Sequence, residues 1–138
     1  MHKDADETWD AYYGRLKERR LSEAELLWAE MEAGGVTSEI VLALDFSHFS
    51  PERAAAQSLA EQLTEKYTVQ VSHDAASGYW FINGTTRPSG ITLEEEQHRG
   101  WVEFMSDVAK SHACVFASWT LEAPRLGKRF SSEDIDVE

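Results

Sequence analysis

The sequence predicts a single α+β domain, and three observations lead to this prediction. The chain has 138 residues, close to the usual size of one domain, and 42 % of them are hydrophobic, which is enough to bury a core. Segments with apolar side chains at helical spacing lie between short runs rich in β-branched and aromatic residues. Glycine and proline separate these segments, so each is predicted to be a helix or a strand.

The first segment, residues 7–33, is predicted to be helical because its apolar residues recur near helical spacing and it contains no proline. Arg20 interrupts the apolar stripe, and Ser22 and Glu25 have the S-x-x-E spacing of a capping box, which marks a helix start. The segment is therefore predicted to be either one long helix or two helices with a break just before Ser22. The glycine pair at 34–35 ends the helix in either case.

Residues 39–46 (EIVLALDF) are predicted to form the first strand because they are rich in branched apolar side chains. A helix over residues 50–66 follows, with Ser50 as its N-cap. Residues 67–72 alternate as a half-buried strand does, and residues 79–83 are rich in aromatic side chains. The short connection between these two strands predicts a hairpin.

Thr92 and Glu95 have the spacing of a second capping box, which predicts the start of a helix that runs to about residue 111. Residues 113–121 are predicted to be the last strand, and Pro124 ends it. The resulting order is a helix followed by β-α-β-β-α-β, which is the order of the split βαβ arrangement. The sequence therefore predicts a ferredoxin-like βαββαβ fold, with a four-stranded antiparallel sheet, two helices on one face and an N-terminal helical extension.

Three regions follow from this assignment. Residues 1–36 are predicted to be the helical extension, packed on the domain. Residues 37–124 are predicted to be the ferredoxin-like domain. Residues 125–138 are polar and end in an acidic stretch, so we expect them to form a disordered tail.

The chain is strongly acidic, with 13 Lys and Arg against 25 Asp and Glu and a net charge of −12. This charge repels phosphate backbones and anionic lipids and attracts basic surfaces, although it also simply keeps a protein in solution. We therefore expect a basic protein partner and no direct contact with nucleic acid or membrane. No apolar run approaches the roughly 20 residues that span a bilayer, and the N-terminus lacks a signal-peptide core, so we expect a cytoplasmic protein.

No residues show a catalytic or metal-binding pattern. The five histidines are scattered, and Cys114 is the only cysteine, which excludes an intrachain disulfide and a zinc site built on cysteines. The consecutive carboxylates at 94–96 point about 100° apart on a helix, so they do not converge on one reacting atom. The chain also lacks a phosphate-binding loop and a nucleophile elbow. We expect no catalytic residues, no cofactor and no metal.

The third strand of the RNA-recognition motif, which is also a ferredoxin-like fold, has a partial counterpart in this chain. Gly78, Tyr79 and Phe81 match that motif, whereas Ser77 replaces its leading basic residue and Gly84 its last aromatic residue. The first predicted strand also lacks the aromatic residue that would stack a second base. Together with the acidic charge, these differences argue against RNA binding.

The second face of the predicted sheet is a candidate contact surface. Asp45 interrupts an apolar strand and, by alternation, points away from Leu44 and Phe46, so it is either solvated or in contact with a partner. Trp80 and Trp119 lie on strands that leave large side chains near solvent unless the N-terminal helix covers that face. Both possibilities stay open: a second face closed as ordinary core, or a protein-binding patch.

Several motifs recur in an order and spacing known from one family. Residues 45–50 (DFSHFS) end the first strand and precede an Ala-rich helix, and residues 67–69 (YTV) begin the next strand. Residues 116–124 (FASWTLEAP) resemble a closing Y-D-G-W motif and its later proline, with Ala117 and Ser118 in place of Asp-Gly. Over nearly its whole length the chain resembles a divergent member of the ribonuclease E inhibitor RraB family (regulator of ribonuclease activity B).

This resemblance implies a ferredoxin-like fold and a non-catalytic regulator that binds the basic C-terminal scaffold of ribonuclease E and lowers its activity. An acidic domain can associate with such a scaffold electrostatically. The candidate partner contacts are Asp45, Trp80, Trp119 and Glu122. Two alternatives stay open: an immunity-like or antitoxin-like acidic binder with a different partner, and an enzyme with a cleft between the sheet and the N-terminal helix. The oligomeric state is left open.

Overall fold

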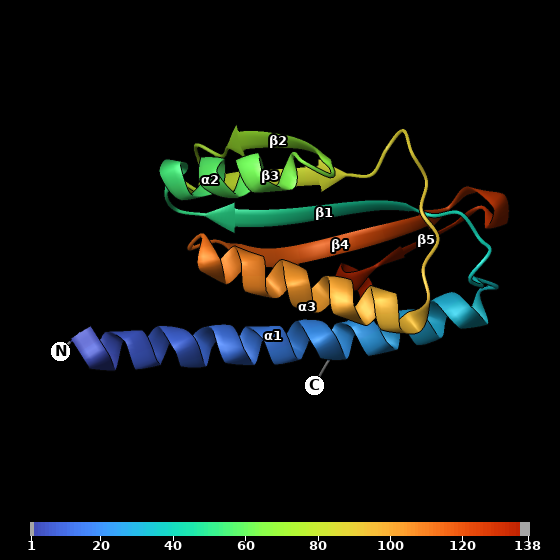
Figure 1. Ribbon diagram of the computed structural model, residues 1–138, viewed down its shortest axis with the longest axis horizontal. Helices are drawn as coiled ribbons and strands as arrows, with labels where there is room; N and C mark the ends of the chain where they lie inside the picture. Colours follow the sequence, from blue (N-terminus) through green and yellow to red (C-terminus); the bar gives the residue numbers. More distant parts are fainter. Residues whose placement is uncertain (1, 136–138) are drawn as a thin grey trace.

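The computed structural model describes residues 2–135, and it places one antiparallel sheet beside three long helices (Figure 1). The helices are α1 (His2–Ala33), α2 (Arg53–Leu63) and α3 (Glu95–Ser111). The strands are β1 (Ala43–Ser50), β2 (Thr68–His73), β3 (Trp80–Thr85), β4 (Val115–Ala123) and β5 (Lys128–Ser131). The predicted α+β class is confirmed.

The sheet has the strand order β2-β3-β1-β4-β5, and every neighbouring pair is antiparallel. The four predicted strands are present, and β5 adds a fifth strand that the sequence did not predict. The predicted count of four strands is therefore wrong.

The tail prediction is wrong for the residues that the structure describes after Pro124. Gly127 adopts a left-handed conformation (φ 62°) that turns the chain from β4 back into β5. Phe130 then contacts the backbone at Gly34, and Ile135 is buried. These two apolar anchors hold a segment whose polar composition alone predicted disorder. The last acidic residues, 136–138, lie outside the described part of the chain.

Strand β1 lies later in the chain than the predicted 39–46. It continues through Ser47, His48, Phe49 and Ser50, whose side chains alternate between the two faces of the sheet. His48 and Ser50 are buried toward the helices despite their polarity. Because hydropathy alone ends the strand at the first polar pair, the sequence could not place this half of β1.

Helices α2 and α3 each begin two residues later than predicted. The N-cap of α2 is Glu52, and Ser50 instead accepts a hydrogen bond from the Glu52 main-chain N–H (3.2 Å). The N-cap of α3 is Glu94 instead of Thr92, with Gln97 completing the capping box. The shift of α2 arises because β1 extends through Ser50, further than the polarity of its last residues suggested.

Helix α1 is continuous, so there is no break before Ser22. Arg20, which interrupts the apolar stripe, points toward the sheet: its Nε donates to the carbonyl oxygen of Phe116 (2.9 Å), and its guanidinium pairs with Glu23 (2.8 Å). A polar residue is therefore accommodated in the helix interface because it satisfies a carbonyl beside the β-bulge in β4.

All three helices lie on one side of the sheet. Helix α1 runs antiparallel to α3 and lies beside it (Figure 1), with ion pairs from Asp10 to Lys110 (3.0 Å) and from Lys17 to Asp107 (3.0 Å). The C-terminal half of α1 also reaches the helix side of β5 through the contact between Gly34 and Phe130. Helix α1 therefore leaves the second face of the sheet uncovered.

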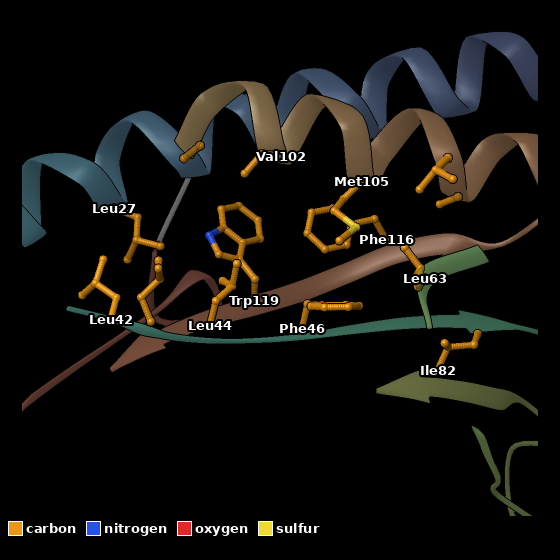
Figure 2. Packing of buried hydrophobic residues seen from close by; sticks show 14 of the residues in the cluster. Leu27, Leu42, Leu44, Phe46, Leu63, Ile82, Val102, Met105, Phe116 and Trp119 are labelled. Carbon is orange, nitrogen blue, oxygen red and sulfur yellow. The ribbon is translucent and has the colours of Figure 1, made fainter. Parts of the chain in front are cut away.

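The core fills the space between the helices and the sheet (Figure 2). Trp119 from β4 stacks on Phe116 (5.3 Å between ring centroids), and its indole N–H donates to Nε2 of His98 (3.0 Å). Leu27 and Met31 bring α1 into the same cluster, and both are fully buried. The N-terminal helix is thus an integral part of the core.

Candidate functional site

The uncovered side of the sheet, here called the open face, carries mainly hydroxyl and amide side chains. Strand register places Thr68, Thr85, Asp45, Thr120 and Ser131 in one row across all five strands. The next row consists of Gln70, Asn83, Ser47 and Ser118. Each of these residues alternates with a core residue, so the polarity of the open face follows directly from strand periodicity.

Two of the predicted contact residues, Asp45 and Glu122, lie on the open face and share one cation. Arg87 approaches Asp45 through Nε (3.4 Å) and Glu122 through a terminal nitrogen (3.7 Å). Thr85 donates a short hydrogen bond to the Asp45 carboxylate. Arg129 lies opposite Glu122 in the β4–β5 register. The two carboxylates and two guanidiniums balance, so the open face carries little of the negative charge of the molecule.

A hollow of about 470 Å³ occupies the middle of the open face. Its lining consists of Asp45, Phe46, Ser47, Thr68, Gln70, Asn83, Gly84, Thr85, Ser118 and Thr120. Asp45 is the one ionisable side chain among them.

One end of the open face is aromatic. Phe49 of β1 lies opposite Phe81 of β3, with ring centroids 6.3 Å apart, and the Tyr79 ring is 5.2 Å from that of Phe49. Tyr79 is 40 % exposed. The first strand therefore does supply an aromatic partner for the third strand, contrary to the sequence analysis. That partner was missed because the predicted strand ended before Phe49.

The two predicted tryptophan contacts lie on the helix side of the sheet. Trp119 is 1 % exposed and belongs to the core, so it cannot contact a partner of the folded protein. Trp80 is half-buried, stacks on His73 (4.2 Å) and lies 5.5 Å from the Arg53 guanidinium at the start of α2. We therefore remove Trp119 from the candidate surface. Because Trp119 alternates with polar neighbours, the sequence predicted that its side chain points away from theirs. It did not predict which face of the sheet the helices cover.

A second candidate site is a groove of about 270 Å³ between α1 and α3, here called the acidic groove. Its lining is Ala24, Glu25, Trp28, Ala29, Glu32, Glu95, His98 and Arg99. Three carboxylates therefore share the groove with a single cation, Arg99, which is 3.5 Å from Glu25. Trp28 and His98 close its inner side, with ring centroids 5.5 Å apart.

The acidic groove lies where charge pairing between the two helices stops. Along α1 and α3, Asp10 pairs with Lys110, Lys17 with Asp107, and Glu25 with Arg99. Beyond this last pair, about two turns further along α1 and about one turn nearer the start of α3, the groove is lined by Glu32 and Glu95, which have the same charge. Because these carboxylates have no cation from the facing helix, this end of the helix pair attracts positive charge from outside.

Buried ionisable groups lie outside both candidate sites or form their inner wall. Burial lowers the pKa of His48 to about 3 and that of His98 to about 4. Burial also raises the pKa of the Cys114 thiol to about 11, which keeps it unreactive. Among residues 2–135, no three His, Cys, Asp or Glu side chains lie together where they could hold a metal ion.

Comparison with known proteins gives no assignment. No protein-family model matches the sequence, and a search of curated proteins finds no match. Within the part of the chain that the structure describes, no helix has the length and apolar character needed to cross a membrane.

Proposed function

We propose that this chain is a non-catalytic regulator that binds a basic segment of a ribonuclease, of the ribonuclease E type, in the acidic groove and so modulates RNA turnover. The observation that carries the proposal is the set of unpaired carboxylates of Glu32 and Glu95 at the end of the α1–α3 pair. An arginine side chain suits this groove because its planar guanidinium bonds two carboxylates at once and packs against aromatic rings.

The motif resemblance supplies the class of partner, and the net charge of −12 supports a basic one. The sequence placed the contact on the sheet at Asp45 and Glu122, but Arg87 and Arg129 together offset those two charges. We therefore assign the docking role to the helices. A basic partner of another kind, as for an immunity-like or antitoxin-like protein, would use the same groove.

Charge reversal in the acidic groove tests the proposal. The full chain is titrated with a fragment of the ribonuclease E C-terminal scaffold by calorimetry, at low and at high salt. We expect binding that weakens as salt rises, and an affinity about tenfold or more lower for the Glu32→Lys/Glu95→Lys variant, a loss of about 1.4 kcal/mol or more.

The matched control is Glu61→Lys/Glu65→Lys, which changes the net charge equally at exposed positions in and after α2. This control keeps most of the affinity if the contact is local. Equal losses for the two variants would show that only overall charge matters. Binding of an unrelated Arg-rich peptide but not of the scaffold would support the acidic groove as a binding site for basic segments and would contradict ribonuclease E as the partner.

Fold and location complete the proposal. The strand order β2-β3-β1-β4, with α2 after β1 and α3 after β3, supports a ferredoxin-like arrangement extended by β5 and α1. A cytoplasmic location follows from the proposed partner.

The aromatic end of the open face favours a second candidate function, the binding of single-stranded RNA. Phe49 and Phe81 lie on adjacent central strands, where exposed rings can stack bases. Asn83 and Gln70, exposed on the same face, offer donors and acceptors to base edges. The net charge of −12 opposes this function, so it ranks second.

If this second function exists, a short single-stranded RNA binds at low salt, and Phe49→Ala weakens binding by roughly 1–3 kcal/mol, the usual contribution of one stacked base. Fluorescence anisotropy with labelled RNA measures it. The control is Trp9→Ala, which removes an exposed aromatic ring of helix α1, on the opposite side of the sheet from the open face. An equal loss in both variants, or no binding at low salt, would reject this function.

A further inference from the structure

The two edges of the sheet differ in how well they are protected from another strand. Strand β5 is short, carries Lys128 and Arg129, and is bounded by 3-10 turns at both ends. Strand β2 has six residues in regular register with β3, contains no proline, lysine or arginine, and pairs on one side only. Proteins usually block an edge with charge, proline or a bulge, and β2 has none of these.

The hydrogen-bond pattern identifies which backbone groups of β2 point outward. The main-chain N–H of Asp74 donates to the carbonyl of Tyr79 (2.9 Å), which makes this a hydrogen-bonded pair that continues the β2–β3 register. Because such pairs alternate along an antiparallel ladder, Ser72, Gln70 and Thr68 bond β3 as well. The backbone groups of Val69 and Val71 therefore face away from the sheet, toward solvent.

The side chains around this edge are self-complementary. In an antiparallel pair of two β2 strands centred on Gln70, Val69 of each copy lies opposite Val71 of the other, which joins outward backbone groups and half-buried apolar side chains. The same register places Gln70 of one copy opposite Gln70 of the other, at the centre of the pair.

We propose that two copies of this chain associate through antiparallel pairing of β2 with β2, about a two-fold axis at Gln70. The continuous sheet that results keeps the helices of both copies on one side, since residues directly opposite point to the same face. The acidic groove and the open face stay free, so this interface does not depend on the proposed function.

A charge-swap experiment tests the register. Sedimentation velocity and light scattering measure the mass of the full chain from about 1 μM to about 1 mM, a range that covers weak association. We expect a concentration-dependent dimer. Gln70→Glu places two carboxylates opposite each other at the two-fold axis and weakens the dimer about tenfold or more, and an equimolar mixture of Gln70→Glu and Gln70→Lys restores the affinity to within about threefold.

Two further variants fix the interpretation. Val71→Pro removes an outward N–H without removing a bond to β3, so it abolishes the dimer while far-UV circular dichroism stays unchanged. Arg125→Gln alters the net charge as Gln70→Glu does, at an exposed position near β5, and leaves the dimer intact. A monomer at every concentration, a dimer that survives Val71→Pro, or no rescue by the mixture of Gln70→Glu and Gln70→Lys would overturn the proposal.

Discussion

Replacing Trp119 with alanine is expected to lower the free energy of unfolding by about 3–5 kcal/mol, the range for removal of a large buried aromatic side chain. The ring is 1 % exposed and stacks on Phe116, and its removal leaves a cavity beneath α3. The change also takes the hydrogen-bond donor away from Nε2 of His98. Chemical denaturation monitored by circular dichroism measures the loss.

Two matched variants separate these contributions. Trp119→Phe keeps a stacked ring but loses the indole N–H, so it isolates the hydrogen bond to buried His98 and part of the volume change; its cost is about 1–3 kcal/mol. Trp9→Ala removes a tryptophan that is 59 % exposed and changes stability by less than about 0.5 kcal/mol. Similar losses for Trp119→Ala and Trp9→Ala would contradict the assignment of Trp119 to the core.

Stability is expected to fall steeply as the pH drops below about 6.5. The pKa of His48 is lowered from 6.5 to about 3 and that of His98 from 6.5 to about 4, in both cases by burial, with a weaker opposing effect of the Met105 main chain on His48. Between these values the unfolded chain binds protons that the folded chain does not, so acid favours unfolding. Above about pH 6.5 both histidines are neutral in both states, and their contribution to the slope vanishes.

Over each pH unit in which a histidine is protonated only in the unfolded chain, the free energy of unfolding falls by about 1.4 kcal/mol. The two histidines together therefore lower it by about 4 kcal/mol between pH 7 and pH 5. That is a large share of the 5–15 kcal/mol typical of a domain. Urea unfolding at a series of pH values measures the slope. Carboxylates add to it only near and below their own, lower pKa range.

Substitution of the two histidines shows whether they cause the slope. Neither ring nitrogen of His48 has a hydrogen-bond partner among the described residues, so His48→Leu removes one proton site without breaking such a bond. His98→Gln keeps an acceptor for the Trp119 indole. Each variant halves the slope between pH 6.5 and pH 5, and the double variant nearly removes it. An unchanged slope in the double variant would contradict this account.

Much of the local structure could be predicted from the sequence. The α+β class, the order of the elements and the polarity of Asp45 and its neighbours follow from spacing, because alternation and helical periodicity are local properties. The predicted boundaries of elements were wrong where polar residues are buried, as at His48 and Ser50 in β1. The fifth strand was missed for a related reason, since a few apolar residues, Leu126, Phe130 and Ile135, anchor a segment that is otherwise polar.

The sequence by itself determined the three helices, four of the five strands and which side chains within a strand share a face. Only the tertiary structure decided which face the helices cover, and with it the burial of Trp119 and the position of the half-buried Phe49 on the open face. It also decided that Glu32 and Glu95 line one groove, because that depends on how α1 packs along α3. Long-range packing is set by the sum of many weak contacts between distant segments, and no short sequence pattern encodes that sum.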